Sequence, residues 1–214
     1  MHKIIDIKNL PKEIPIFPLS NCLLLPSGTI SLNIFEPRYL NMTEDAISSN
    51  RLIGMIQPRN NYENYHDLYP IGCVGKITHF SELKNNKYLI ELTGICRYQL
   101  LDHTLTDKNY RIANIDFTEY FLDLEASKIT LDFSVKKQFL ISLKNYFASQ
   151  KIDADWKIIE KAPSNVLINS LAQSCPFNTE EKQMLLESKD LSDLTNIMIT
   201  LFEIYSAGEI KSLN

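Results

Sequence analysis

The chain has 214 residues, of which 44% are hydrophobic and 22% are charged. These proportions are ordinary for a globular protein and exclude disordered and collagen-like classes. Its 22 basic and 26 acidic side chains give a net charge of −4, which argues against a general polyanion-binding protein. The length permits one large domain or two small ones, with a core that needs neither disulfides nor metals.

The amino terminus and the cysteines indicate where the protein works. The first ten residues carry several charges and no apolar run of signal-peptide length, and no segment approaches the roughly 20 apolar residues of a membrane span. We therefore expect a cytoplasmic protein. Cys22, Cys73, Cys96 and Cys175 lie far apart without a CxxC pair. This pattern is typical of buried free thiols, so we expect no metal site and no cofactor.

The first half of the chain has the pattern of short strands separated by turn residues. Runs rich in β-branched, aromatic and leucine residues predict strands at 14–17, 22–25, 29–34, 52–56, 71–80, 87–93, 95–103 and 110–117. Asn85-Asn86 suits a tight hairpin turn. One interruption is predicted to be helical, because Pro37 suits a first helical position and apolar residues then recur on one face. Strands at this spacing predict an antiparallel sheet that closes into a small barrel or forms a sandwich.

The second half of the chain changes to a helical period. Apolar residues recur three and four apart over 135–147 and 191–205, which predicts two amphipathic helices. Asn178 followed by Glu181 resembles a capping box and predicts a further helix start. Gly208 is well placed as the stop of the last helix.

Strands followed by helices predict an α+β chain with segregated layers. We place the boundary so that residues 1–125 form the β domain and residues 126–214 form a helical subdomain.

The sequence lacks the motifs of phosphate-binding loops, of GxSxG hydrolases and of HExxH zinc proteases. Gly75-Lys76-Ile77 lacks both the preceding glycine and the following Ser or Thr of a phosphate-binding loop. Gly72 and Gly75 lie in a strand-like run, which favours bulge or close-packing positions over a nucleic-acid-binding GxxG loop. There is no GxSxG or HExxH motif, and the four histidines are scattered. We therefore assign no catalytic residue.

Glu36-Pro37-Arg38-Tyr39 places an acid, a helix-starting proline, a guanidinium and an aromatic ring within four residues. The favoured interpretation is structural: Glu36 complements the helix amino terminus and pairs with Arg38. Contact of Glu36, Arg38 and Tyr39 with a ligand is the alternative.

Two further features are candidates for binding. Tyr62, Tyr65 and Tyr69 lie in a polar segment whose composition is common at adaptable contact surfaces, although loops also collect variable sequence. Arg97 stands beside Tyr98 on a predicted strand that follows Gly94, taken here as a turn glycine. A structural role is favoured for Arg97, and ligand contact is kept as the alternative.

In this order, the motifs resemble the amino-terminal, substrate-binding domain of Lon proteases. The similarity covers roughly residues 14–119, is most specific over 35–39, and continues in a helical stretch over 167–201. It implies a PUA-like antiparallel β-barrel followed by a helical subdomain. It does not imply proteolysis, because the ATPase and Ser-Lys protease domains of Lon would follow this region and the sequence stops at Asn214. The resemblance is to a stand-alone protein of the kind found in many bacteria.

We therefore predict a non-catalytic module that binds unfolded or exposed polypeptide segments or a protein partner, such as a separate protease or chaperone. An extended peptide would add to a free sheet edge, with nearby tyrosines giving some selectivity. Contact with RNA is the alternative, since PUA-like barrels occur in RNA-binding proteins, but the acidic composition makes nucleic acid an unexpected partner. A peptidase with an unrecognised site is the third hypothesis. The sequence assigns no oligomeric state.

Overall fold

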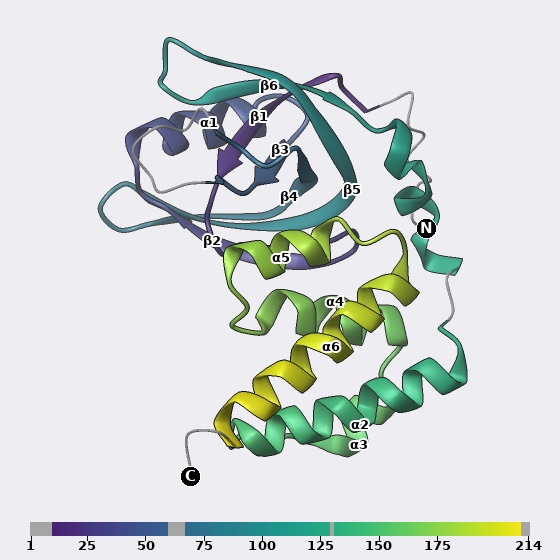
Figure 1. Ribbon diagram of the computed structural model, residues 1–214. Helices are drawn as coiled ribbons and strands as arrows, with labels where there is room; N and C mark the ends of the chain where they lie inside the picture. The colour runs from purple at the N-terminus through teal and green to yellow at the C-terminus, as the bar shows by residue number, and fades with distance from the viewer. Residues whose placement is uncertain (1–9, 60–66, 129–130, 211–214) are drawn as a thin grey trace. The chain divides into compact units, whose positions relative to one another are not determined.

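The computed structural model of the chain describes residues 10–59, 67–128 and 131–210 (Figure 1). The chain divides into two compact units, the first made of residues 1–127 and 177–186 and the second of residues 128–176 and 187–214. The chain first passes from one unit to the other after residue 127. The segment 177–186, expected in the helical part, is grouped with the strands.

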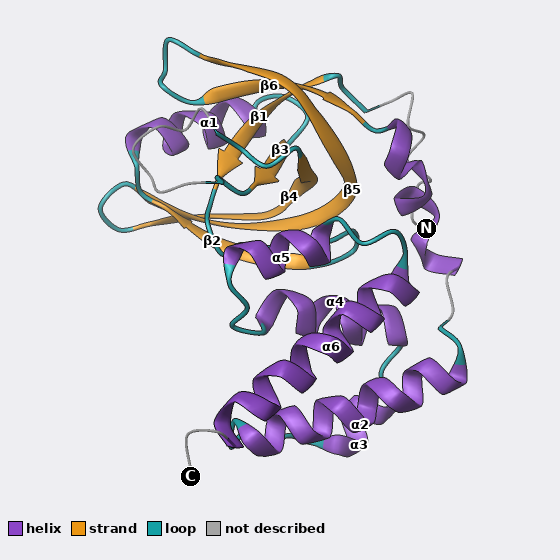
Figure 2. Cartoon of the chain, viewed as in Figure 1, coloured by secondary structure: helices purple, strands orange, loops and turns teal. Residues whose placement is uncertain are grey.

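The first unit is built on a six-stranded sheet (Figure 2). Its strands are β1 (Glu13–Pro18), β2 (Thr29–Ile34), β3 (Leu52–Ile56), β4 (Ile71–Leu83), β5 (Lys87–Leu105) and β6 (Arg111–Asp116). Their order is β2-β5-β4-β3-β1-β6, and an additional pairing of β5 with β6 closes all strands except β2 into a ring. β2 stands outside this ring and pairs antiparallel with β5.

The α+β class is confirmed, but the sheet is mixed and not antiparallel throughout. β1 and β3 run parallel, with Ile16 opposite Gly54. A parallel pair needs a long crossover connection, and the chain between β1 and β3 provides one through β2 and helix α1 (Pro37–Ile47). A reading of strand patterns alone does not show which strands become neighbours, so this parallel pair was not predicted.

The strand predicted at 22–25 is wrong. This segment is irregular, and Leu23, Leu24 and Leu25 are buried in it. The apolar run therefore reflects burial against the sheet and not strand pairing.

Gly94 was expected in a turn and instead lies inside β5, which is one long strand where two were predicted. It stands opposite Gly75, next to a register shift between β4 and β5. A Cβ atom at Gly94 would overlap the carbonyl oxygen of Leu25. The glycine is required by this close approach of the backbone and not by a change of chain direction.

The core of the ring explains the glycines of β4. The core contains Ile14, Ile16, Val74, Cys96, Tyr98, Ala113 and Ile115, among others. The aromatic side chain of Tyr98 lies against Gly72, and any side chain at position 72 would overlap this aromatic group. Tyr98 Oη donates a hydrogen bond to Met55 O at 3.3 Å. The close-packing interpretation of Gly72 is confirmed, and Gly75 lies at the predicted irregularity.

Two local predictions in the first unit are confirmed. Asn85 and Asn86 have φ angles of 64° and 52°, as a tight turn of type I′ between β4 and β5 requires. Asn178 and Glu181 form a reciprocal capping box, in which each backbone N–H donates to the other side chain at 2.8 and 2.9 Å. The box begins helix α5 (Thr179–Leu186).

Buried polar contacts fix α5 within the first unit. Lys182 Nζ donates to Asn21 O at 2.8 Å, and Gln183 Nε2 donates to Ile71 O at 3.1 Å. Gln57 Nε2 donates to Gln183 Oε1 at 3.1 Å. Because a buried donor without a partner is costly, these bonds set the position of the helix.

The second unit is helical. It contains α2 (Phe133–Ser149), α3 (Trp156–Lys161), α4 (Ser164–Ser174) and α6 (Leu191–Ile210), and the 3-10 segment η2 (Thr118–Lys128) precedes it. Tyr146 of α2 stacks on Phe202 of α6 with ring centroids 4.8 Å apart, so the two amphipathic helices are confirmed. The stop predicted at Gly208 is wrong, since α6 continues to Ile210. A glycine in a helix costs only about 1 kcal/mol, so it does not by itself end one. Among the described helices, none is long and apolar enough to cross a membrane.

Candidate functional site

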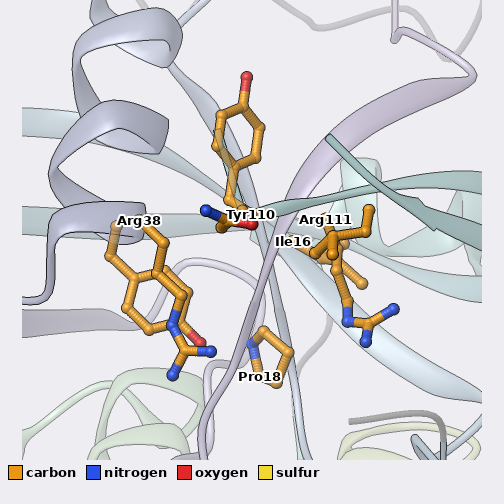
Figure 3. Close-up of a pocket in the computed structure, with 8 residues that line it drawn as sticks. Ile16, Pro18, Arg38, Tyr110 and Arg111 are labelled. Atoms are coloured by element: carbon orange, nitrogen blue, oxygen red, sulfur yellow. The ribbon is translucent and has the colours of Figure 1, made fainter. Parts of the chain in front are cut away.

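A pocket of about 210 Å³ in the first unit gathers residues from α1, β1, β5 and β6 (Figure 3). It is lined by Ile16, Pro18, Arg38, Tyr39, Leu105, Asn109, Tyr110 and Arg111. Mouths of β-barrels are a common place for binding pockets.

The strand register places Arg111 at the end of the ring. Arg111 is the first residue of β6 and stands opposite Ile16 of β1 and Leu105 of β5. Residues directly opposite one another on antiparallel strands project from the same face. Ile16 is completely buried in the core, and so is Ala113, the next residue of β6 on that face. Arg111 therefore occupies an inward-facing position where the ring opens.

The first turn of α1 forms another wall of the pocket. Arg38 donates from Nε and Nη2 to Glu36 Oε2, at 3.0 and 2.6 Å, and its guanidinium lies 4.8 Å from the centre of the Tyr39 ring. Tyr39 is 5% exposed and packs on Phe17, with ring centroids 4.2 Å apart. The predicted Glu36–Arg38 pair is thus present, although Glu36 makes no side-chain capping bond to the helix. Arg38 and Tyr39 both face the pocket.

Asp45, which also belongs to α1, holds Tyr110 at the pocket. Tyr110 Oη donates to Asp45 Oδ2 at 2.8 Å, and Lys108 Nζ donates to both Asp45 oxygens at 2.7 and 2.8 Å. The hydrogen bond from Lys108 is the main cause that lowers the pKa of Asp45. Burial, followed by the bond to Asp45, raises the pKa of Tyr110 to about 12. Tyr110 is therefore a neutral donor at physiological pH.

The pocket wall carries positive charge in an acidic protein. Two of its lining residues are arginines, and none of the described residues that line it is acidic. Figure 3 shows the guanidinium groups of Arg38 and Arg111 on either side of Pro18. Arg111 Nη1 lies 3.0 Å from His103 Nδ1. Since guanidinium only donates, this imidazole nitrogen accepts. The guanidinium group is a planar fork of donors that suits carboxylate or phosphate oxygens.

Of the three candidate tyrosines of the polar segment, the structure describes Tyr69. Tyr62 and Tyr65 are outside the described residues. Tyr69 is half-buried, its backbone N–H donates to Gln57 O at 2.9 Å, and the Arg59 guanidinium lies 5.5 Å from its ring centre. Tyr69 is not among the residues that line the pocket.

Arg97 has internal contacts in the first unit. It is 7% exposed and donates from Nε and Nη2 to the two carboxylate oxygens of Asp123, at 2.9 and 2.8 Å. Its Nη1 donates to Leu186 O at 3.1 Å, and its guanidinium lies 4.5 Å from the centre of the Tyr120 ring. Burial opposes the charged form, but the bonds and the charge of Asp123 outweigh it and raise the Arg97 pKa. Arg97 thus joins β5, η2 and α5.

The described cysteines do not form a reactive or metal-binding centre. Burial raises the pKa of Cys22 to about 11 and that of Cys96 to about 12, so both thiols are protonated at neutral pH. Within the described part of the chain, no group of three or more His, Cys, Asp or Glu residues could hold a metal ion.

Sequence reasoning missed Leu105, Asn109, Tyr110 and Arg111. A charged residue at the start of a strand is common, and its inward direction appears only when the register with β1 is known. The strand pattern around Arg111 held no signal that would have singled it out.

Comparison with known proteins shows that this chain is similar to the substrate-binding part of Lon proteases. It matches the family of the ATP-dependent protease La (LON) substrate-binding domain over residues 13–202. It is 26% identical over 200 residues to a Lon protease of Dictyoglomus thermophilum, covering 87% of this chain and 24% of that protein. It is 27% identical over 209 residues to a Lon protease of Desulfosudis oleivorans, covering 94% of this chain and 25% of that protein. The chain thus spans about a quarter of these relatives.

Solved structures show the same fold. A Lon N-terminal domain protein from Xanthomonas campestris superposes with a TM-score of 0.63 at 18% identity, covering 87% of this chain and 96% of that one. The N-terminal domain of a Mycobacterium avium complex Lon protease gives a TM-score of 0.63 at 13% identity, covering 90% and 98%. With the family match over residues 13–202, the chain belongs to the LON substrate-binding domain family.

Proposed function

We propose that the protein is a non-catalytic recognition module that binds unfolded or exposed polypeptide segments through its first unit. The observation that carries this proposal is the match to a substrate-binding domain over residues 13–202. In this proposal the bound segment is held for a partner such as a separate protease or chaperone. The four free thiols support a reducing, cytoplasmic location.

Two features of the first unit suit a polypeptide ligand. β2 stands at the end of the strand order, and an extended segment that pairs with its outer edge would gain main-chain hydrogen bonds without regard to sequence. The pocket at the ring mouth adds side-chain contacts, since Leu105 lines it and is 58% exposed. Main-chain pairing with one modest pocket predicts weak and promiscuous binding.

The test compares the binding of one substrate polypeptide in its unfolded and its native form. A fluorescently labelled polypeptide, kept unfolded by reduction and carbamidomethylation of its cysteines, is titrated with the chain while anisotropy is recorded. The same polypeptide in its native form is the control. We expect saturable binding of the unfolded form only. Absence of saturable binding, while circular dichroism shows a folded chain, would contradict the proposal.

The same assay distinguishes the two alternative functions, RNA contact and peptidase activity. If a labelled RNA oligonucleotide binds and the unfolded polypeptide does not, and if the RNA affinity falls steeply as salt is raised, RNA contact is favoured. Cleavage of the polypeptide, followed by mass spectrometry, would favour a peptidase.

A further inference from the structure

We infer that the pocket at the mouth of the ring selects a carboxylate in the bound polypeptide, with Arg38 and Arg111 as the residues that recognise it. The carboxylate belongs either to an Asp or Glu side chain or to the carboxyl terminus of the segment. This inference rests on the proposed function and adds a chemical preference to it.

The two guanidinium groups come from different elements and meet at one cavity. Arg38 belongs to the first turn of α1, and Arg111 begins β6 on the inward face of the ring. They flank Pro18 in Figure 3 and line the same pocket. Charged donors to a carboxylate form stronger hydrogen bonds than neutral donors do, so two of them facing one space favour an anionic group.

Two acids, Glu36 and Asp45, accept hydrogen bonds from residues that line the pocket. Glu36 accepts both bonds from Arg38 through one oxygen, Oε2. Asp45 accepts from Lys108 and Tyr110. These pairs hold Arg38 and Tyr110 in place, which lowers the entropy lost when a ligand binds.

The size and lining of the pocket favour a carboxylate over a nucleotide. Its volume of about 210 Å³ is smaller than the roughly 300–1,000 Å³ of pockets for drug-sized ligands. Ile16, Pro18 and Leu105 add apolar wall beside the two cations. One acidic side chain or chain terminus, with its aliphatic carbons on this wall, fits such a space.

The experiment uses three synthetic peptides of one apolar sequence. The first has a free carboxyl terminus, the second is amidated at that end, and the third is amidated and carries an internal Glu in place of Gln. Dissociation constants are measured by anisotropy for the unchanged chain and for Arg111→Gln. Arg51→Gln is the matched control, because Arg51 is exposed and does not line the pocket. The hydrogen bonds of residue 51 with Ala46 and Ile77 use backbone atoms only, so Gln keeps them.

We expect at least one carboxylate peptide to bind about tenfold more tightly than the amidated peptide without Glu. Arg111→Gln should remove most of this difference, whereas Arg51→Gln should retain it. If the first peptide alone is favoured, the pocket takes a chain terminus. If the third alone is favoured, it takes an acidic side chain. Arg111→Lys, which keeps the charge and loses the fork of donors, should give an intermediate difference and replaces Arg111→Gln if that variant fails to fold.

Equal affinity for all three peptides would overturn the carboxylate preference and leave the proposed function standing. Failure of every peptide to bind a folded chain would instead contradict the proposed function, and the inference with it. Binding of a phosphate-bearing oligonucleotide that displaces the peptides and depends on Arg111 would also overturn the inference, in favour of nucleic acid.

Discussion

Arg97 and Asp123 form a buried, two-bond ion pair, with Nε and Nη2 of the arginine 2.9 and 2.8 Å from the two carboxylate oxygens. Each side chain is 9% exposed. The backbone N–H of Arg97 donates to the same carboxylate at 2.9 Å. The pair therefore connects β5 to η2 through both main-chain and side-chain atoms.

Removal of one partner of this pair should destabilise the first unit strongly. Arg97→Met leaves Asp123 buried without its cation, which typically costs about 3–5 kcal/mol. Urea denaturation followed by circular dichroism measures the loss. Lys108→Gln, which breaks an ion pair with side chains 53% and 37% exposed, is the control and should cost at most about 1 kcal/mol. Equal effects of the two substitutions would contradict the structural role of Arg97.

Gly94→Ala should destabilise the chain although it adds only a methyl group. The new Cβ would overlap the backbone of Leu25, which cannot turn away as a side chain can. Overpacking of this kind costs about 1–3 kcal/mol. Thr93→Ala, at the neighbouring position of β5, loses exposed hydroxyl contacts without adding atoms and is the control for an alanine substitution in this strand. If thermal melting shows the two variants to be equally stable, the backbones at Gly94 and Leu25 do not lie as close as the structure shows.

The thiols of the folded chain should react slowly with iodoacetamide. Burial raises the pKa of Cys22 to about 11 and that of Cys96 to about 12, and burial also raises the pKa of Cys73 well above its ordinary value. Only the thiolate is nucleophilic, so little of the reactive form exists at pH 8. Mass spectrometry of peptides should show little labelling of these three cysteines in buffer and full labelling in urea. Fast native labelling of Cys96 would contradict its buried position.

Asp45 should make the stability of the first unit depend on acid. Its pKa in the folded chain lies below the ordinary 3.8, chiefly because Lys108 donates to it. The stabilisation is therefore fully present above about pH 4 and is lost as the pH falls through the lower, folded-state value. The stability difference between the unchanged chain and Asp45→Asn should be positive at pH 7 and shrink as the pH falls below about 4.

Lys108→Gln is the matched variant for the acid effect, because it removes the main cause of the shift. In a chain that already carries Lys108→Gln, the substitution Asp45→Asn should lower the stability at pH 7 by less than it does in the unchanged chain. Urea titrations at several pH values provide both measurements. If the stability difference between the unchanged chain and Asp45→Asn stays the same well below about pH 4, an ionic role for Asp45 is excluded.

Part of the candidate site could be predicted from the sequence. Glu36, Arg38 and Tyr39 are neighbours along the chain, so the Glu36–Arg38 pair and the contact of Arg38 with the Tyr39 ring are local. Arg111 and Tyr110 could not be predicted, because they meet Arg38 and Tyr39 only through the pairing of β6 with β1.

The partners of Arg97 could not be predicted from the sequence. The sequence marks a cation beside an aromatic on a strand, but it holds no information on what the guanidinium meets. Asp123 and Leu186 are distant along the chain, and only their placement shows that the arginine is internal.

The sequence by itself determined the features whose causes are local. The Asn178–Glu181 capping box, the Asn85-Asn86 turn and the bounds of β2 and β3 depend on residues a few positions apart, so their energies can be judged without the fold. Only the tertiary structure decided the parallel pairing of β1 with β3, the buried irregular segment at 22–25 and the pocket. These depend on which distant segments become neighbours, because the free energy of burial is gained only when the ring closes.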